Sequence, residues 1–222
     1  MKEQNEENNL EVSGFLAKSE QYIEKNKKAL IIVASAIVVI GLGIWAYIGL
    51  VANPRQVRAA EDMFPAEQHL NEGNYELALN GNDNHLGFLD IIDQYGCTKS
   101  GNLAKYYAGV CELNLGKYDE AIGHLKSYKG RDIFTGAMAL MMIGDAYCEM
   151  EDFSQAVNYY GKAVNASDDA VVTPAALWKQ GMTFLSMGEK EQAKSCFEQI
   201  KQNYPQSIEY NEADKYIGLC GE

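Results

Sequence analysis

An uninterrupted apolar run near the N-terminus dominates the hydrophobic pattern of the chain. Residues 29–52 contain no charged side chain and are rich in Leu, Ile and Val. As a helix, the run would be about 36 Å long at about 1.5 Å per residue, which exceeds the roughly 30 Å hydrocarbon core of a bilayer. Trp45 and Tyr47 occupy its second half, where an aromatic belt would lie. The pattern predicts one transmembrane helix.

A cleaved signal peptide is the alternative interpretation of this run. Its apolar region would span only about 7–15 residues, between a short basic start and a small-residue cleavage site. Here the run is longer, it follows 28 residues that include six glutamates, and Leu50-Val51-Ala52 is a poor cleavage site. These differences favour an uncleaved anchor.

The lysines beside the run predict its orientation. Lys18, Lys25, Lys27 and Lys28 precede it, whereas only Arg55 and Arg58 follow closely. Because basic residues accumulate on the cytoplasmic side, we expect residues 1–28 in the cytoplasm and residues 53–222 across the membrane. The reverse orientation is the alternative, with the large domain in the cytoplasm.

Beyond the run, the hydrophobic pattern repeats itself. Residues 115–122 (LGKYDEAI), 150–157 (MEDFSQAV) and 187–194 (MGEKEQAK) share one arrangement of turn and apolar positions. Gly109, Gly144 and Gly181 are spaced 35 and 37 residues apart, and so are Ala121, Ala156 and Ala193. Two markers that keep the same spacing indicate a true internal repeat.

The repeated segments resemble the tetratricopeptide repeat (TPR), whose period is about 34 residues and whose pattern is W-x2-L-G-x2-Y…A-x3-F…P. The matching residues are Ile143, Gly144, Tyr147, Ala156 and Tyr160 in one copy, and Gly181, Phe184, Ala193, Phe197 and Pro205 in the next. The resemblance implies helical hairpins in which small residues allow close approach and aromatic rings fill the adjacent space. The residue before a proline disfavours the helical region, so Pro205 should end a helix.

The predicted fold is therefore all-α, a single N-terminal transmembrane helix followed by a TPR solenoid with a capping helix. The expected segments are a cytoplasmic tail at 1–28, the transmembrane helix at 29–52 and the TPR domain at 53–222, with repeats at about 57–96, 102–130, 137–168 and 174–205 and the cap at 206–220. The first repeat is degenerate, because 43 residues separate Ala78 from Ala121. The extra residues are expected around 80–85 and 96–100. No alternating strand pattern of useful length follows the anchor.

Charge and cysteine content narrow the range of functions. The net charge is −12, and residues 1–28 contribute only −1 of it. An acidic domain repels phosphate, so we expect no nucleic-acid partner. The five cysteines lack any CxxC spacing, which gives no sign of a zinc or redox site. They are expected to be mainly buried apolar residues, although a single bridge such as Cys97–Cys220 remains open.

The sequence contains no recognisable catalytic motif, so we predict neither an enzyme nor a cofactor, metal or small-molecule site. Asp90 and Asp93 would be neighbours on one helix face, where such a pair is usually solvated. The Asn-rich segment 80–84 faintly resembles a calcium loop, but it lacks the spaced acidic ligands and the closing glutamate.

A protein-binding groove is the remaining candidate site. In TPR arrays, the first helix of each hairpin lines a concave surface. The equivalent positions in this chain are Tyr106, Met141 and Trp178, and one turn later Val110, Asp145 and Met182. They do not match the Lys, Asn and Arg clamp that grips a C-terminal carboxylate in some TPR proteins. Their apolar, Met-rich character favours binding of varied polypeptide segments, although Met138, Met141 and Met142 could instead fill contacts between hairpins.

Taken together, the anchor and the repeats over about residues 15–222 resemble the ancillary subunit of the bacterial Sec translocon. The resemblance implies a single-pass protein of the bacterial inner membrane, with its TPR domain in the periplasm. Its expected partners are exported polypeptides or translocon components. The alternative is a stoichiometric scaffold for envelope assembly or cell division, without client binding.

Overall fold

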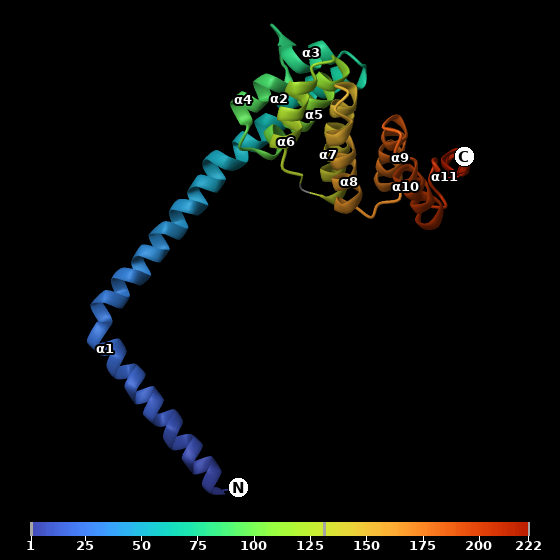
Figure 1. Ribbon diagram of the computed structural model, residues 1–222. Helices are drawn as coiled ribbons and strands as arrows, with labels where there is room; N and C mark the ends of the chain where they lie inside the picture. The colour runs from blue at the N-terminus through green and yellow to red at the C-terminus, as the bar shows by residue number, and fades with distance from the viewer. Residues whose placement is uncertain (1, 131, 222) are drawn as a thin grey trace. The chain divides into compact units, whose positions relative to one another are not determined.

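The computed structural model describes residues 2–130 and 132–221, with side chains from residue 25 onward, and it divides into two compact units at residues 54/55 (Figure 1). The side chains of the predicted tail up to residue 24, including Lys18, lie outside the described set. The first unit contains helix α1 (Lys2–Tyr47), followed by one π-helical segment, η1 (Ile48–Ala52).

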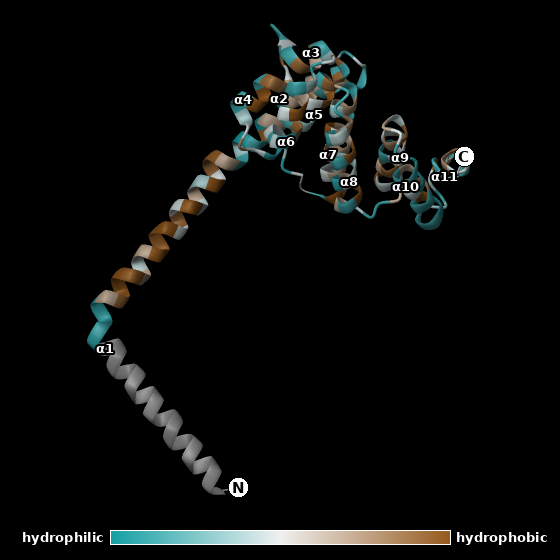
Figure 2. Ribbon diagram, in the orientation of Figure 1, coloured by the Kyte–Doolittle hydropathy of each residue, from teal (hydrophilic) through white to brown (hydrophobic). Residues whose placement is uncertain are grey.

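The large apolar side chains of the first unit are exposed. Trp45 is 75% exposed, and the large aliphatic side chains around it are exposed as well. Figure 2 shows this stretch as a mostly brown ribbon. Within the described chain, one helical segment, Lys25–Asn71, is long and apolar enough to cross a membrane by length and composition. A signal sequence near the N-terminus would satisfy the same criteria.

The second unit is a stack of helical hairpins, as the repeat predicted. Its elements are α2 (Asn53–Asn71), α3 (Tyr75–Asn80), β1 (Gly81–Asn82), β2 (His85–Leu86), α4 (Phe88–Tyr95), α5 (Lys99–Asn114), α6 (Tyr118–Ser127), α7 (Ile133–Glu149), α8 (Phe153–Ala166), α9 (Val172–Ser186), α10 (Lys190–Asn203) and α11 (Tyr210–Cys220). Helix α10 ends two residues before Pro205, as expected from the backbone restriction that proline imposes.

The insert in the first repeat contains a small departure from the all-helical prediction. Strands β1 and β2 pair antiparallel, with Gly81 opposite Leu86 and Asn82 opposite His85. The Asn82 Oδ1 accepts hydrogen bonds from the backbone N–H groups of Asn84 and His85, at 2.8 and 3.0 Å. These bonds close a tight turn, so asparagine stabilises the hairpin locally rather than offering oxygens to a cation.

The repeat markers lie where the hairpins approach most closely. A Cβ atom on Gly109, Gly144 or Gly181 would lie 2.5 Å from Leu125, 2.6 Å from Tyr160 or 2.8 Å from Phe197, respectively. Ala121, Ala156 and Ala193 are fully buried beside them. Small residues are therefore required where α5 meets α6, α7 meets α8 and α9 meets α10.

The hydrophobic core consists of three clusters along the stack. One lies among α2–α5, one among α5–α8 and one among α9–α11. In the last, Tyr216 of α11 packs on Trp178 and Phe197, with ring centroids 5.0 and 5.4 Å apart. Helix α11 thus covers the apolar side of α10, which is the role expected of the capping helix.

Candidate functional site

A cavity of about 640 Å³ lies among the three C-terminal hairpins. Helices α5 to α9 all contribute to its lining. On α7, the partly buried Asp145 marks what we call the floor, and the exposed Glu149 marks the rim. The lining residues are Leu113, Tyr118, Asp145, Cys148, Glu149, Tyr160, Trp178, Lys179, Met182 and Thr183. We call this cavity the groove.

A hydrogen-bonded triad joins three helices at the floor of the groove. The Asp145 Oδ1 of α7 accepts a hydrogen bond from the Tyr160 hydroxyl of α8 at 2.8 Å and from the Lys179 Nζ of α9 at 2.9 Å. Burial raises the pKa of Tyr160 well above its ordinary value of 10.0, and the charge of Asp145 and their hydrogen bond raise it further. Tyr160 therefore remains a neutral donor that positions Asp145.

The rest of the wall is apolar, with one acidic group at the rim. Trp178 and Met182 present large side chains one turn apart on α9. Trp178 is held edge-on against Phe197 at 5.3 Å between ring centroids, so its ring is fixed from behind. The Glu149 carboxylate at the rim accepts a long hydrogen bond from the Tyr118 hydroxyl, 3.4 Å. Because Lys179 is already paired with Asp145, the charge left at the rim is negative.

The structure brings together three of the six predicted groove residues, Asp145, Trp178 and Met182. Val110 and Met141 are half-buried and do not line the groove, and Val110 packs on the central core cluster.

Tyr106, predicted to face the concave surface, is instead a core residue with 8% exposure. Its ring packs against Tyr107 and Tyr128, with centroids 5.7 and 5.5 Å away. Burial, with smaller contributions from those two tyrosines, raises the pKa of Tyr106 to about 12.

Sequence reasoning missed the groove residues contributed by second helices and by helix ends. Tyr160 was visible only as a repeat-pattern aromatic, and Tyr118 as part of the hairpin turn. Glu149 ends α7, one turn beyond Asp145. Glu149 could have been predicted from this i, i+4 spacing, because residues four apart lie on the same helix face as each other.

Three other residues that could carry chemistry, Glu112, His124 and Asp90, have structural partners. Buried Glu112 pairs with the Nδ1 of His124 at 2.8 Å and links α5 to α6. Asp90 accepts a hydrogen bond from the Gly87 N–H at the start of α4. Among the described residues, no group of three His, Cys, Asp or Glu side chains is arranged to hold a metal ion.

All five cysteines are unpaired in the structure. Cys111 and Cys196 are buried, as expected, and desolvation raises the pKa of their thiols to about 12 and about 11. Cys97 is exposed and Cys148 is only partly buried, so burial does not extend to every cysteine.

Comparison with known proteins identifies the repeats. Residues 103–131 and 175–207 match one family description of the tetratricopeptide repeat, and residues 137–169 match a second. Two solved structures are similar in fold, both crystal structures of MamA. The first is 20% identical, with a TM-score of 0.58 over 73% of this chain and 80% of that chain. The second is 20% identical, with a TM-score of 0.56 over 70% of this chain and 81% of that chain. No curated protein matches the chain significantly. The chain carries TPR repeats, and these findings support a protein–protein interaction module.

Proposed function

We propose that this protein is a membrane-anchored TPR module that binds extended polypeptide segments in the groove. The size and the lining of the groove are the main support for this proposal. It is about 640 Å³, within the range of pockets that bury a ligand, and it combines an apolar wall with a few fixed polar groups. No catalytic constellation accompanies it among the described residues, which favours binding over chemistry.

The chemistry of the lining indicates the kind of segment. Trp178 and Met182 would receive an apolar side chain, and the thioether of Met182 adapts to different shapes. Glu149 at the rim would favour a neighbouring lysine or arginine. Segments that alternate apolar and basic residues are common in polypeptides that have not yet folded, so binding should tolerate many sequences.

The location of the module is also part of the proposal. The exposed apolar stretch of α1 supports a single span of the inner membrane. The excess of lysines before the run supports an N-terminus in the cytoplasm and a TPR domain in the periplasm. Exported polypeptides or translocon components are then the partners within reach.

A binding measurement on the full chain in detergent tests the groove. The probe is reduced lysozyme with its thiols blocked by iodoacetamide, an unfolded basic polypeptide, labelled with a fluorophore for anisotropy. Met182→Glu should weaken binding by about tenfold or more, since a buried charge replaces an apolar contact. Met150→Glu is the control for added charge, because Met150 is exposed at a hairpin turn and does not line the groove. Met182 also packs on the C-terminal core cluster, so thermal unfolding of both variants establishes that the domain still folds.

Two outcomes would count against client binding in the groove. Equal binding by the Met182→Glu and Met150→Glu variants would remove the groove from the interaction. Absence of probe binding, together with capture of one stoichiometric envelope partner from membranes, would favour the scaffold. Trp178→Ala is less informative, because Trp178 also supports Phe197 and Tyr216.

A further inference from the structure

One edge of the second unit combines the start of α2 with the loops that lead into α5, α7, α9 and α11. We call it the anchor edge, comprising residues 55–57, 96–99, 128–130, 132–134, 167–171 and 204–209. Figure 1 shows the last three of these loops at one end of the hairpins, with the α7–α8 and α9–α10 turns at the other.

Hydrogen bonds connect the parts of the anchor edge in sequence. The Gln56 Oε1 at the start of α2 accepts a hydrogen bond from the Lys99 N–H at 2.8 Å. The Asn102 side-chain amide then donates a hydrogen bond to the Lys129 carbonyl oxygen at 2.9 Å, and its Oδ1 accepts one from the Lys129 N–H at 3.0 Å.

The same continuity extends through the C-terminal loops. Ile133 lines a shallow cavity together with Asp168 and Tyr204. The Tyr204 hydroxyl also donates to the Asp168 carboxylate at 2.9 Å. Segments distant in the sequence therefore form one continuous edge.

The anchor edge exposes an unusual amount of apolar surface. Ile133 is 69% exposed, Val171 64% and Ile208 88%. Eight large apolar side chains of the described second unit are exposed, and five of them lie on this edge, counting Val57 and Phe134. Loops and helix starts are normally polar where they face water, so this concentration indicates a surface that is covered in the working protein.

Three backbone N–H groups in or beside these loops are already bonded to aspartate side chains of the same loops. The Asp169 Oδ1 accepts the N–H groups of Val171 and Val172, at 2.7 and 2.9 Å. Asp132 accepts the N–H of Thr135 at 2.7 Å. A loop with internal partners can leave bulk water at a smaller cost than one that relies on solvent.

The covalent connection indicates what covers the edge. The exposed apolar run ends at Ala52, and the second unit begins at Arg55. If the run spans a membrane, the chain connection alone keeps the start of α2 within a few residues of the bilayer, whatever the angle between the two units. The remaining loops of the anchor edge are continuous with that point.

We infer that the anchor edge rests on the bilayer surface, with Ile133, Val171 and Ile208 among the lipid headgroups. This inference rests on the proposed membrane span. The occupant is phospholipid, because the bilayer is the apolar surface that the chain itself holds beside this edge. Apolar side chains that enter the interface supply the attraction.

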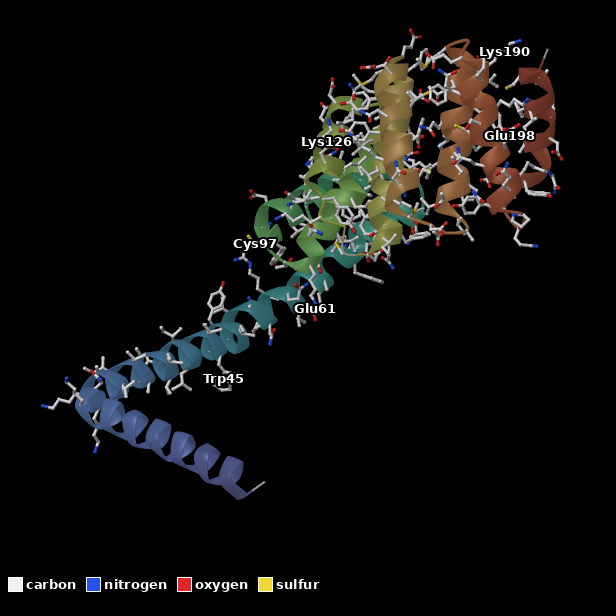
Figure 3. The ribbon with its side chains drawn as sticks, turned by 60° about the horizontal axis from the view of Figure 1, so that its bottom comes forward. Trp45, Glu61, Cys97, Lys126, Lys190 and Glu198 are labelled. Carbon is white, nitrogen blue, oxygen red and sulfur yellow. The ribbon has the colours of Figure 1, made fainter. Side chains whose placement is uncertain are left out.

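Photo-crosslinking in liposomes tests the inference with the full chain. A benzophenone amino acid replaces Val171 or Ile208, and vesicles of phosphatidylcholine and phosphatidylglycerol provide the probe lipid. Lipid adducts, measured by mass spectrometry, should exceed those from Met150 and Lys190 by about tenfold, as expected for interfacial insertion. Met150 is an exposed apolar residue at the α7–α8 turn, and Lys190 lies at the end of the domain away from Cys97 (Figure 3).

A crosslinker at Val38 separates the two proposals. Lipid adducts at Val38 but not at Val171 or Ile208 would overturn docking of the edge and leave the span intact. Absence of lipid adducts at Val38 would overturn the span itself. Protein adducts in place of lipid adducts at Val171 and Ile208 would place a second chain on the edge and overturn the inference.

Charge substitution provides an independent check. With the crosslinker at Ile133, the V171D/I208D double variant should lose most lipid adducts at that position. The Met150→Asp variant should keep them. An unchanged yield in the double variant would contradict insertion of these side chains.

Discussion

At the scale of single residues, one glycine in each of three hairpins determines how closely its two helices approach. Gly109, Gly144 and Gly181 each face a bulky side chain of the second helix where a Cβ atom would overlap it. Gly144 also affects the groove, because the ring that it contacts belongs to Tyr160. The Tyr160 hydroxyl donates a hydrogen bond to Asp145 in the groove floor.

Gly144→Ala should therefore lower stability. Displacing the Tyr160 ring costs about 1–3 kcal/mol as overpacking, which exceeds the gain in helix propensity of about 1 kcal/mol. Urea unfolding of the full chain in detergent, followed by far-UV circular dichroism, measures the difference.

Gly123→Ala is the matched control for this substitution. Gly123 lies within α6 with nothing near its missing Cβ, so alanine should raise stability by about 0.5–1 kcal/mol. Loss of stability in both variants would show that the contact with Tyr160 is not the cause.

Buried hydroxyl and thiol groups make the domain sensitive to alkali. The pKa of Tyr160 is raised above 10.0, and Cys111 moves from 9.0 to about 12, in both cases chiefly through burial. A raised pKa in the folded state gives stability that is complete below the unfolded value and is lost as the pH rises above it. The contribution of these groups to the free energy of unfolding should be constant at pH values well below 9.0 and fall from there towards about 12.

Tyr160→Phe should separate the two contributions of this residue. It removes the hydrogen bond to Asp145 and should cost about 1 kcal/mol at neutral pH. Its stability should then decline less steeply than that of the natural chain above pH 10.0, the ordinary pKa of tyrosine. Parallel alkaline profiles would show that other groups control the decline.

At the scale of elements, each hairpin is closed by the same turn geometry. Gly116 and Gly188 adopt positive φ values of 73° and 78°, and Glu151 occupies the equivalent place at 61°. The helices that follow pack through Ala121, Ala156 and Ala193, which have no exposed surface. Regular turns and small contact residues together allow successive hairpins to stack with similar geometry.

Ala156→Trp should disrupt the central hairpin. The indole has no space between α7 and α8, so we expect destabilisation at or above the upper end of the usual overpacking range of about 1–3 kcal/mol. Asn158→Trp is the control, because Asn158 is exposed on the same helix. Thermal unfolding of both variants measures the effect, and an unchanged midpoint for Ala156→Trp would contradict the packing described.

Over the whole molecule, the apolar run lies in the first unit and most of the negative charge lies in the second. The exposed run of the first unit has no charge over residues 29–52, whereas almost all of the net negative charge follows it. The acidic TPR unit carries the groove, while the first unit supplies the proposed attachment to the membrane.

The attachment can be tested by introducing charge into the run. The double variant V38R/V39R should move the chain from the pellet to the supernatant in alkaline carbonate extraction. Each arginine near the centre of a span disfavours insertion by about 2.5–3.5 kcal/mol. I133R/I208R adds the same charge to the anchor edge and should stay in the pellet. Release of both variants would show that added charge alone detaches the chain.

The helical class, the spacing of the repeats and the apolar run could all be predicted from the linear pattern of residues. These features are local or periodic, and each follows from spacing that a linear pattern displays. Gly144 and Ala156, for example, were placed at a close helix contact from their spacing together with the resemblance to the TPR. The β1–β2 turn was missed because its pairing involves only four residues and depends on the side-chain bonds of Asn82.

Which helix faces meet and which remain open depends on how the hairpins pack on one another. Equivalent repeat positions receive different neighbours, so Tyr106 is enclosed by Tyr107 and Tyr128, whereas Trp178 reaches the groove. The anchor edge likewise depends on loops tens of residues apart, such as those containing Asp168 and Tyr204. A repeat pattern specifies the hairpins, but the packing of each hairpin on its neighbours determines burial and creates the surfaces between them.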